Sequence, residues 1–138
     1  MEKAGTNESK FKSKIGEDKI RSKLFFGKIE EANISVDGHF EHNGKLYLLE
    51  IDSGNEAKLL VGQYILLDAL YDTKKHKHFE KDNCVFLVVH YYNGYIPERT
   101  IKNLDKIKEI YNTSMEYLVF HEKDITDWED LIYKIENK

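Results

Sequence analysis

The stretch Val36–Tyr64, VDGHFEHNGKLYLLEIDSGNEAKLLVGQY, decides both the fold and the chemistry that this chain can have. Its first residues alternate apolar and polar side chains, and the Asn43-Gly44 pair that follows accepts the positive φ of a tight hairpin turn. The next run, KLYLLEID, is apolar on both faces, as buried strands are. It ends on Glu50 and Asp52, which strand alternation places on the same face.

The remaining apolar spacing predicts four helices and two further strands around this hairpin. We expect helices over about 12–31, 56–71 and 98–111 and a last one after an N-cap at Thr126, with strands at CVFLVVHYY and EYLVFHE. Strands that are joined through helices need crossover connections. The prediction is an α/β fold, in which a mixed β-sheet made of the hairpin and the crossover strands is flanked by helices.

The bulk composition predicts one globular domain. The chain has 138 residues, of which 41% are apolar and 33% charged, and no apolar run reaches the roughly 18–20 residues of a membrane-spanning helix. The N-terminal residues lack the apolar segment of a signal peptide, and a single cysteine, Cys84, excludes an internal disulfide framework. We therefore expect a cytoplasmic protein without a membrane partner, with a flexible basic arm over residues 1–11 and a single domain over 12–138.

Positive charge gathers at the N-terminus, although the net charge is −4. Residues 1–28 hold eight Lys or Arg and four acids, whereas the remaining 110 residues hold 13 basic and 21 acidic side chains. A basic arm ahead of an acidic body is typical of an element that contacts the phosphates of DNA, and a solvated terminus is the alternative. The candidate DNA-binding residues are Lys10, Lys12, Lys14, Lys19, Arg21 and Lys23.

The acids that end the second hairpin strand are the candidate chemical site. Two carboxylates so close repel each other, which solvent at a strand end or a bound divalent cation relieves. Asp37 on the first hairpin strand adds a third carboxylate, and such an oxygen-rich site suits Mg²⁺ or Mn²⁺. In the other interpretation the strand end is solvated and Asp52 caps the following turn.

The helix after the hairpin carries two further candidates. Lys58 is placed to reach a metal-bound water or a phosphate, and Gln63 to position a phosphate or a water. Both also have an ordinary interpretation as surface side chains of a helix. The histidines of HKH at 76–78 lie in a charged loop without a third ligand at recognisable spacing, so we expect them to be solvated.

This arrangement resembles the PD-(D/E)xK nuclease-like superfamily. Asp37 stands in VDGHF, and a hairpin then leads to Glu50 and Asp52 in LLEIDSG and to a helix. The later segment VFLVVHYYNGYIPERTIKNLDKI is similar to the plasmid replication-relaxation and mobilisation type, and the resemblance covers roughly residues 28–121. Two positions depart from the pattern: the usual proline is Val36, and the lysine of Glu-x-Lys is Asp52.

The resemblance implies a restriction-endonuclease-like core and a Mg²⁺- or Mn²⁺-dependent endonuclease that hydrolyses DNA phosphodiester bonds for a mobile element. Asp37, Glu50 and the carbonyl of Ile51 would bind the metal, Asp52 would add a carboxylate, and Lys58 would replace the missing strand lysine. The resemblance adds Glu30 or Glu31 as an accessory acid, while His39, which alternates onto the face of Asp37, and Gln63 on the following helix are accessory candidates by their positions.

Two other functions stay open at this point. One is a nuclease-fold accessory module that binds DNA or protein without cleaving it, and the other is an interaction domain without a metal. A homodimer and proteins of replication or transfer are the further partners that the resemblance suggests. The sequence does not reveal the recognition sequence, the strand preference or the oligomeric state.

Overall fold

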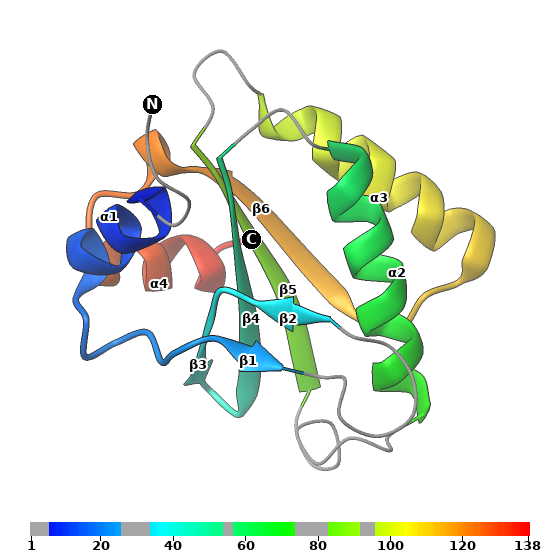
Figure 1. Cartoon of the computed structure of the whole chain (residues 1–138). Coiled ribbons are helices and arrows are strands. Elements are labelled where there is room, and N and C mark those ends of the chain that lie inside the picture. The colour runs from blue at the N-terminus through cyan, green and yellow to red at the C-terminus, as the bar shows by residue number, and fades with distance from the viewer. Residues whose placement is uncertain (1–5, 26–33, 54–56, 74–82, 92–95) are drawn as a thin grey trace.

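A computed structural model describes residues 6–25, 34–53, 57–73, 83–91 and 96–138 of the chain (Figure 1). The elements in chain order are α1 (Thr6–Ile15), β1 (Leu24–Phe25), β2 (Ser35–Val36), β3 (Gly38–His42), β4 (Lys45–Asp52), α2 (Ala57–Thr73), β5 (Asn83–His90), α3 (Pro97–Tyr111), β6 (Glu116–His121), a 3₁₀ turn (Glu122–Asp124) and α4 (Trp128–Glu136). The main sheet has the order β3-β4-β5-β6, and β1 pairs with β2 in a small second sheet. The predicted α/β fold with a mixed sheet is confirmed.

The hairpin forms because its turn residues accept positive φ. Asn43 has φ 51° and Gly44 has φ 78°, and the antiparallel register runs from His42 opposite Lys45 to Gly38 opposite Leu49. β4 then pairs in parallel with β5, and β5 in parallel with β6, through the crossover helices α2 and α3. The hairpin predicted from Asn-Gly is confirmed.

Alternation along the buried strands separates two cores, one on each face of the sheet. Leu46, Leu48, Phe86 and Val88 pack in the core beneath α2 and α3. Tyr47, Leu49, Leu87 and Val89 pack in the other core, whose helical members come from α1 and α4. Figure 1 shows α1 and α4 on the left of the sheet and α2 and α3 on the right. Because Glu50 and Asp52 continue the even-numbered series of β4, they belong to the α2–α3 face.

The first helix differs from the prediction. It spans residues 6–15 instead of 12–31, because Gly16 takes φ 119° and its N–H bonds the carbonyl of Lys12 at 2.9 Å, which ends the helix. The short strand β1 follows where a second half of the helix was expected, and residues 26–33 lie outside the described part of the chain.

The basic N-terminal segment packs on the body of the protein from α1 onward. Phe11 is fully buried and Ile15 is 5% exposed, and both belong to the core that α1 shares with α4. Phe11 also meets the ring of Tyr91 edge-on at 6.3 Å between centroids. The boundary expected between residues 11 and 12 therefore falls inside a packed helix.

The N-cap of the last helix lies one residue later than predicted. Asp127 is the N-cap of α4, and its carboxylate accepts the N–H of Asp130 at 2.9 Å, whereas Thr126 donates its own N–H to the Asp130 side chain.

Among the described helices, none combines the length and the apolar character that a membrane span requires.

Gly38, at the start of β3, has no room for a side chain. A Cβ there would lie 2.7 Å from Cγ2 of Ile20, 3.0 Å from the carbonyl oxygen of Arg21 and 3.3 Å from Cε of Lys12. The backbone oxygen cannot move away without disturbing the bridge between Arg21 and His39. Glycine is therefore what lets the segment after α1 lie directly on the hairpin.

We expect Gly38→Ala to lower the free energy of unfolding by about 1–3 kcal/mol, because overpacking displaces neighbouring backbone. Gly62→Ala is the matched control. The added Cβ at position 62 meets nothing within 4 Å on α2, so alanine should stabilise that helix by roughly 0.5–1 kcal/mol. Urea unfolding measures both values, and a Gly38→Ala protein as stable as the wild type would contradict the packing described here.

Candidate carboxylate site

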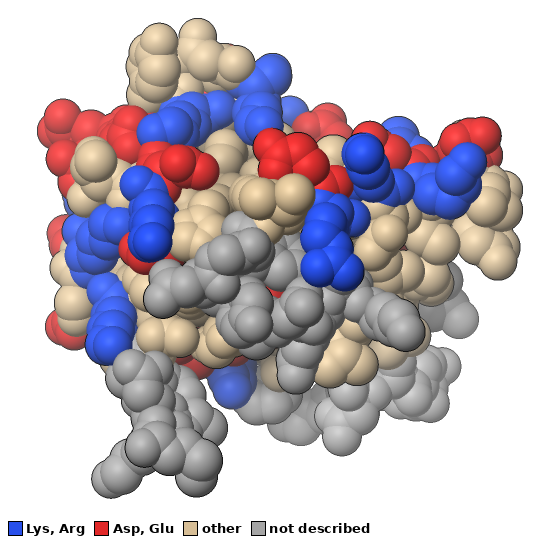
Figure 2. Space-filling model, turned by 90° about the horizontal axis from the view of Figure 1, so that it is seen from above, with Lys and Arg blue, Asp and Glu red and all other residues tan. Residues whose placement is uncertain are grey.

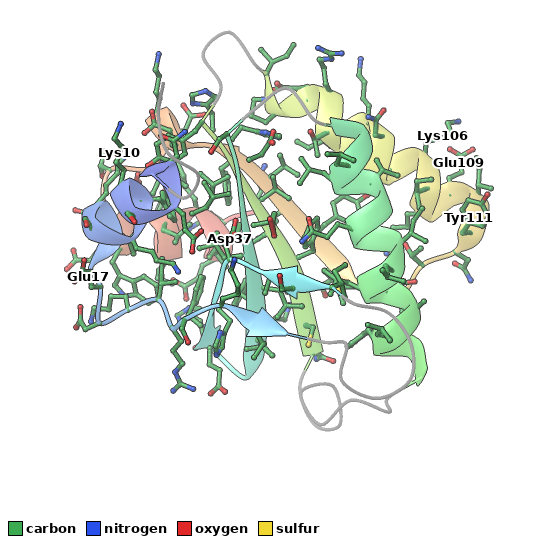
Figure 3. The ribbon with its side chains drawn as sticks, viewed as in Figure 1. Lys10, Glu17, Asp37, Lys106, Glu109 and Tyr111 are labelled. Carbon is green, nitrogen blue, oxygen red and sulfur yellow. The ribbon has the colours of Figure 1, made fainter. Side chains whose placement is uncertain are left out.

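Asp37 lies at the junction of β2 and β3. Its side chain, rather than a main-chain carbonyl, accepts a hydrogen bond from the main chain of β4. Its N–H donates to the carbonyl of Leu49 at 2.9 Å, and its carboxylate oxygen Oδ2 accepts the N–H of Ile51 at 2.8 Å. The side chain is thus fixed against the end of β4 at the point where the chain passes from β2 into the main sheet. Figure 3 shows Asp37 between α1 and α2.

Glu50 lies opposite Asp37 across the hairpin and is held from the other side by α2. The register that pairs Gly38 with Leu49 brings residues 37 and 50 next to each other, and their two carboxyl groups share a hydrogen bond. The Nε2 atom of Gln63 donates to Oε2 of Glu50 at 2.7 Å and to the carbonyl oxygen of Ser35 at 3.0 Å. Gln63 therefore ties α2 to β4 and to β2.

Burial and mutual repulsion keep a proton on this pair. Burial, followed by the charge of Asp37, raises the pKa of Glu50 to about 8, against the hydrogen bond from Gln63. Burial also raises the pKa of Asp37, against the hydrogen bond from the N–H of Ile51. The shared hydrogen bond raises the pKa of Glu50 and lowers that of Asp37, which favours the proton on Glu50.

A lysine of α1 bonds to the main chain of Asp37, and an acid of α1 acts on the pair through its charge. The Nζ atom of Lys12 donates to the carbonyl oxygen of Asp37 at 2.7 Å and to the carboxylate of Glu8 at 3.0 Å. The charge of Glu8 raises the pKa of both Asp37 and Glu50. One end of α1 is therefore electrostatically part of the site.

Asp52 shares a face with Glu50 but bonds to other residues. It is 6% exposed, and its Oδ2 atom lies 2.8 Å from Nδ1 of His90, which occupies the register position beside it on β5. His90 and Thr100, both fully buried, join through Nε2 and Oγ1 at 3.0 Å. These contacts tie the ends of β4 and β5 to α3, and a lysine at position 52 would place an ammonium against His90 in this buried setting.

The other predicted site residues are spread more widely. Nδ1 of His39 lies 2.9 Å from the carbonyl oxygen of Ser22, on the neighbouring segment after α1. The main-chain N–H of Ile51 is the group that holds Asp37. The side chain of Lys58, together with Glu30, Glu31 and the histidines at 76–78, lies outside the described part of the chain.

The predicted DNA-binding residues differ in their exposure and in their partners. Lys14 donates to the carbonyl and the carboxylate of Glu122, and Lys19 lies 3.9 Å from the Asp18 carboxylate and over the ring of Trp128. Arg21 and Lys23 are exposed. Lys10 extends from α1 away from Asp37 in Figure 3. Figure 2, which looks down on the molecule from above, shows Lys and Arg interspersed with Asp and Glu on that face.

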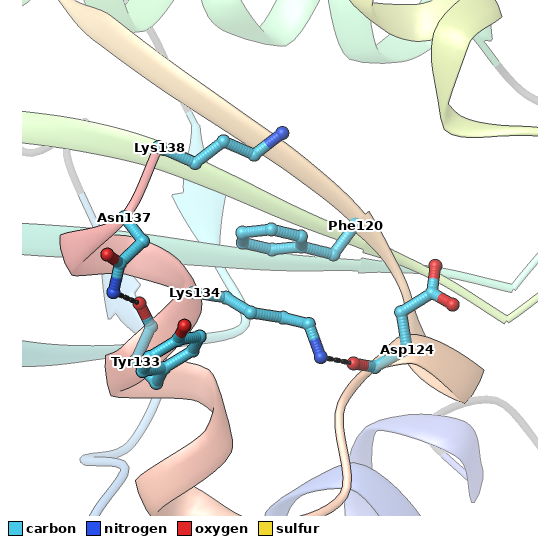
Figure 4. A pocket seen from close by; sticks show the side chains of 6 residues that line it. All are labelled: Phe120, Asp124, Tyr133, Lys134, Asn137 and Lys138. Carbon is cyan, nitrogen blue, oxygen red and sulfur yellow. Dashed lines mark hydrogen bonds between the residues drawn. The ribbon is translucent and has the colours of Figure 1, made fainter.

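A separate cavity lies between β6 and α4 (Figure 4). It has a volume of about 490 Å³ and is lined by Phe120, Asp124, Tyr133, Lys134, Asn137 and Lys138. Lys134 is neutralised there by Asp130, and Lys138 lies 5.3 Å from the Phe120 ring centroid. Because Phe120 belongs to the α1–α4 face, this cavity and the Asp37–Glu50 pair lie on opposite faces of the sheet.

Within the described part of the chain, no three side chains of His, Cys, Asp or Glu lie close enough together to form a metal-binding site by themselves. The Asp37–Glu50 pair can supply two carboxylates, so any further ligands have to be main-chain oxygen, water or substrate. Such incomplete protein coordination is usual for Mg²⁺, which keeps several waters and accepts substrate phosphates as ligands.

The comparisons with known proteins return no neighbour: no family model, no curated protein and no solved structure matches this chain.

Sequence reasoning brought Asp37, Glu50 and Gln63 forward but missed the link of four residues to the predicted acids: Glu8, Lys12, which it assigned only to DNA contact, His90 and Thr100. The first two do carry a signal, since Glu8 and Lys12 stand four residues apart and so share a helix face. His90, at the end of a buried strand, carries no comparable signal.

The raised pKa of Glu50 predicts how the metal-free protein responds to pH. Between its unfolded value near 4.5 and its folded value of about 8, the folded state keeps a proton that the unfolded state has lost. Stability should therefore fall as pH rises through this window, by up to about 1.4 kcal/mol per pH unit. Urea unfolding between pH 5 and 8.5 in the presence of a chelator measures the slope.

Glu50→Gln should remove most of that slope, because glutamine keeps a donor toward Asp37 but cannot ionise. Glu41→Gln, at an exposed position of β3, is the matched control and should keep the wild-type slope. Equal slopes for Glu50→Gln and the wild type would show that Glu50 does not hold the proton.

Proposed function

We propose that this chain is a restriction-endonuclease-like nuclease domain that acts on DNA with Mg²⁺ or Mn²⁺ bound at Asp37 and Glu50. The observation that carries the proposal is the contact of these two partly buried carboxyl groups across the hairpin. A buried pair of acids requires either a shared proton or a cation. A purely structural contact at this position could be made at lower cost by uncharged side chains.

The donor set fits a hard divalent cation. Both side chains offer carboxylate oxygens, which Mg²⁺ and Mn²⁺ prefer over nitrogen or sulfur. Their orientation is set by neighbours that do not compete as ligands, since Ile51 N–H holds one oxygen of Asp37 and Gln63 holds one oxygen of Glu50. The other oxygen of each carboxyl group and the carbonyl of Ile51 are the ligands we assign.

When bound, the metal would lower the pKa of a coordinated water and offset charge on the phosphate. The chain's own residues supply the rest. Gln63 keeps Glu50 turned toward Asp37, while Arg21 and Lys23, exposed after α1, offer positive charge to the DNA backbone. The resemblance to plasmid replication-relaxation and mobilisation proteins supports a role on a mobile element, in replication, transfer or restriction.

A second candidate is a nuclease-fold module that binds DNA or protein and no longer cleaves. The observation that favours it is the environment of Asp52, which stands where the resemblance expects a lysine and is bonded to His90. Metal binding without hydrolysis is the behaviour that this candidate predicts, so the two functions separate in one experiment.

We expect Mn²⁺ to raise the melting temperature of the wild type, and Asp37→Asn and Glu50→Gln each to abolish that rise. Ligand binding to the folded state alone stabilises by about 2.7 kcal/mol at a hundred times Kd, so the shift is easily measured. Glu41→Gln is the control and should keep it. An unchanged shift in both site variants would contradict the assigned ligands.

Cleavage of plasmid and single-stranded DNA in Mn²⁺ completes the test. Hydrolysis that is lost with Asp37→Asn and Glu50→Gln supports the nuclease, whereas Mn²⁺ stabilisation without hydrolysis at high protein concentration supports the binding module. If the wild type gains no stability from Mn²⁺, neither proposal survives.

A further inference from the structure

We propose that Lys12 on α1 is the catalytic cation of this site and contacts the substrate phosphate that binds at the Asp37–Glu50 pair. The inference rests on the proposed nuclease function. It differs from the sequence prediction, which assigned the role to Lys58 on the helix after the hairpin. Lys12 lies in the N-terminal segment, for which the composition predicted only a basic arm that contacts DNA.

The packing of α1 fixes where Lys12 points. Phe11 and Ile15 are inserted in the core, and these two contacts determine the rotation of the helix about its axis. The side chain of Lys12 then crosses Gly38, where a Cβ would come within 3.3 Å of its Cε, and reaches the carbonyl of Asp37. Glycine at position 38 is what opens this path.

Two hydrogen bonds hold the ammonium of Lys12, and one of its N–H donors remains for a ligand. The side chain is 20% exposed, and Asp37 and Glu8 accept two of its three N–H donors at 2.7 and 3.0 Å. The Glu8 contact is an i,i+4 pair within the helix, so it restrains the lysine locally. The third N–H is the one we assign to an oxygen of a phosphate bound at the Asp37–Glu50 pair.

Three other lysines of the basic segment are less suited to this role. Lys14 is directed to Glu122, which follows the end of β6, and Lys19 lies beside Asp18 and Trp128. Lys23 acts on Asp37 only as a charge from an exposed position. Of these four lysines, Lys12 is the one that bonds directly to a residue of the carboxyl pair.

The role is that of a fixed positive charge. An ammonium beside the reacting phosphate stabilises negative charge that grows in the transition state, and it needs no proton transfer to do so. A charge that is already oriented in the metal-free protein loses little entropy when the substrate arrives. The expected effect is on the rate of the bound complex, with little effect on metal affinity, since an ammonium is not a metal ligand.

The test compares Lys12→Gln with Lys12→Arg in the full chain. Glutamine keeps an N–H donor on a side chain that is one methylene shorter and carries no charge, whereas arginine retains the charge. Lys106→Gln removes one positive charge from the exposed surface of α3, well away from Asp37, and is the matched control (Figure 3). Each variant is measured for melting temperature, Mn²⁺ affinity and single-turnover cleavage at saturating DNA.

We expect Lys12→Gln to reduce the single-turnover rate by about 10²–10⁴-fold, the range typical of a catalytic side chain. Its Mn²⁺ affinity should stay within a few fold of the wild type. Lys12→Arg should retain the rate within about tenfold, and Lys106→Gln should match the wild type. This pattern separates a role of the charge from a role of the hydrogen bond alone.

Three outcomes overturn the proposal. Cleavage by Lys12→Gln at the wild-type rate would show that the charge is not used. Equal losses in Lys12→Gln and Lys12→Arg would assign Lys12 to packing. A wild type that binds Mn²⁺ but does not cleave, or that does not bind it, would remove the nuclease function itself, a failure visible before any Lys12 variant is made.

Discussion

The contact between Asp37 and Glu50 is the constraint around which the rest of the site is arranged. Two carboxyl groups are held together in a partly buried position, where burial raises the pKa of both, that of Glu50 to about 8. Neighbouring elements fix this arrangement from three sides: Ile51 on β4, Gln63 on α2 and Lys12 on α1. Such convergence of separate elements on a costly contact is typical of a functional site.

Much of this arrangement follows from local rules. The Asn-Gly turn sets the hairpin register, and that register alone places residue 37 beside residue 50. Alternation along β4 then predicts that Glu50 and Asp52 share a face, and α2 brings Gln63 to Glu50. The hairpin and the acid pair could therefore be predicted from the sequence, because their decisive contacts join residues that are near one another in the chain.

The missed features depend on distant contacts. Lys12 meets Asp37 only because Phe11 anchors α1 in the core, and apolar spacing in the N-terminal segment is equally compatible with a longer helix. Asp52 is bound by His90 because the parallel register of β4 and β5 aligns those two positions. No pattern in either strand alone specifies that register, so the partner of Asp52 could not be identified from its neighbours in the sequence.

The most direct test of the account is the number of protons released when Mn²⁺ binds. Calorimetric titration in buffers of different ionisation enthalpy measures that number. A metal that displaces the proton of Glu50 should release about one proton at pH 7 and almost none above about pH 9, given a pKa of about 8. Binding without proton release at pH 7, or release that persists unchanged in Glu50→Gln, would contradict the claim that the carboxyl pair is the metal site.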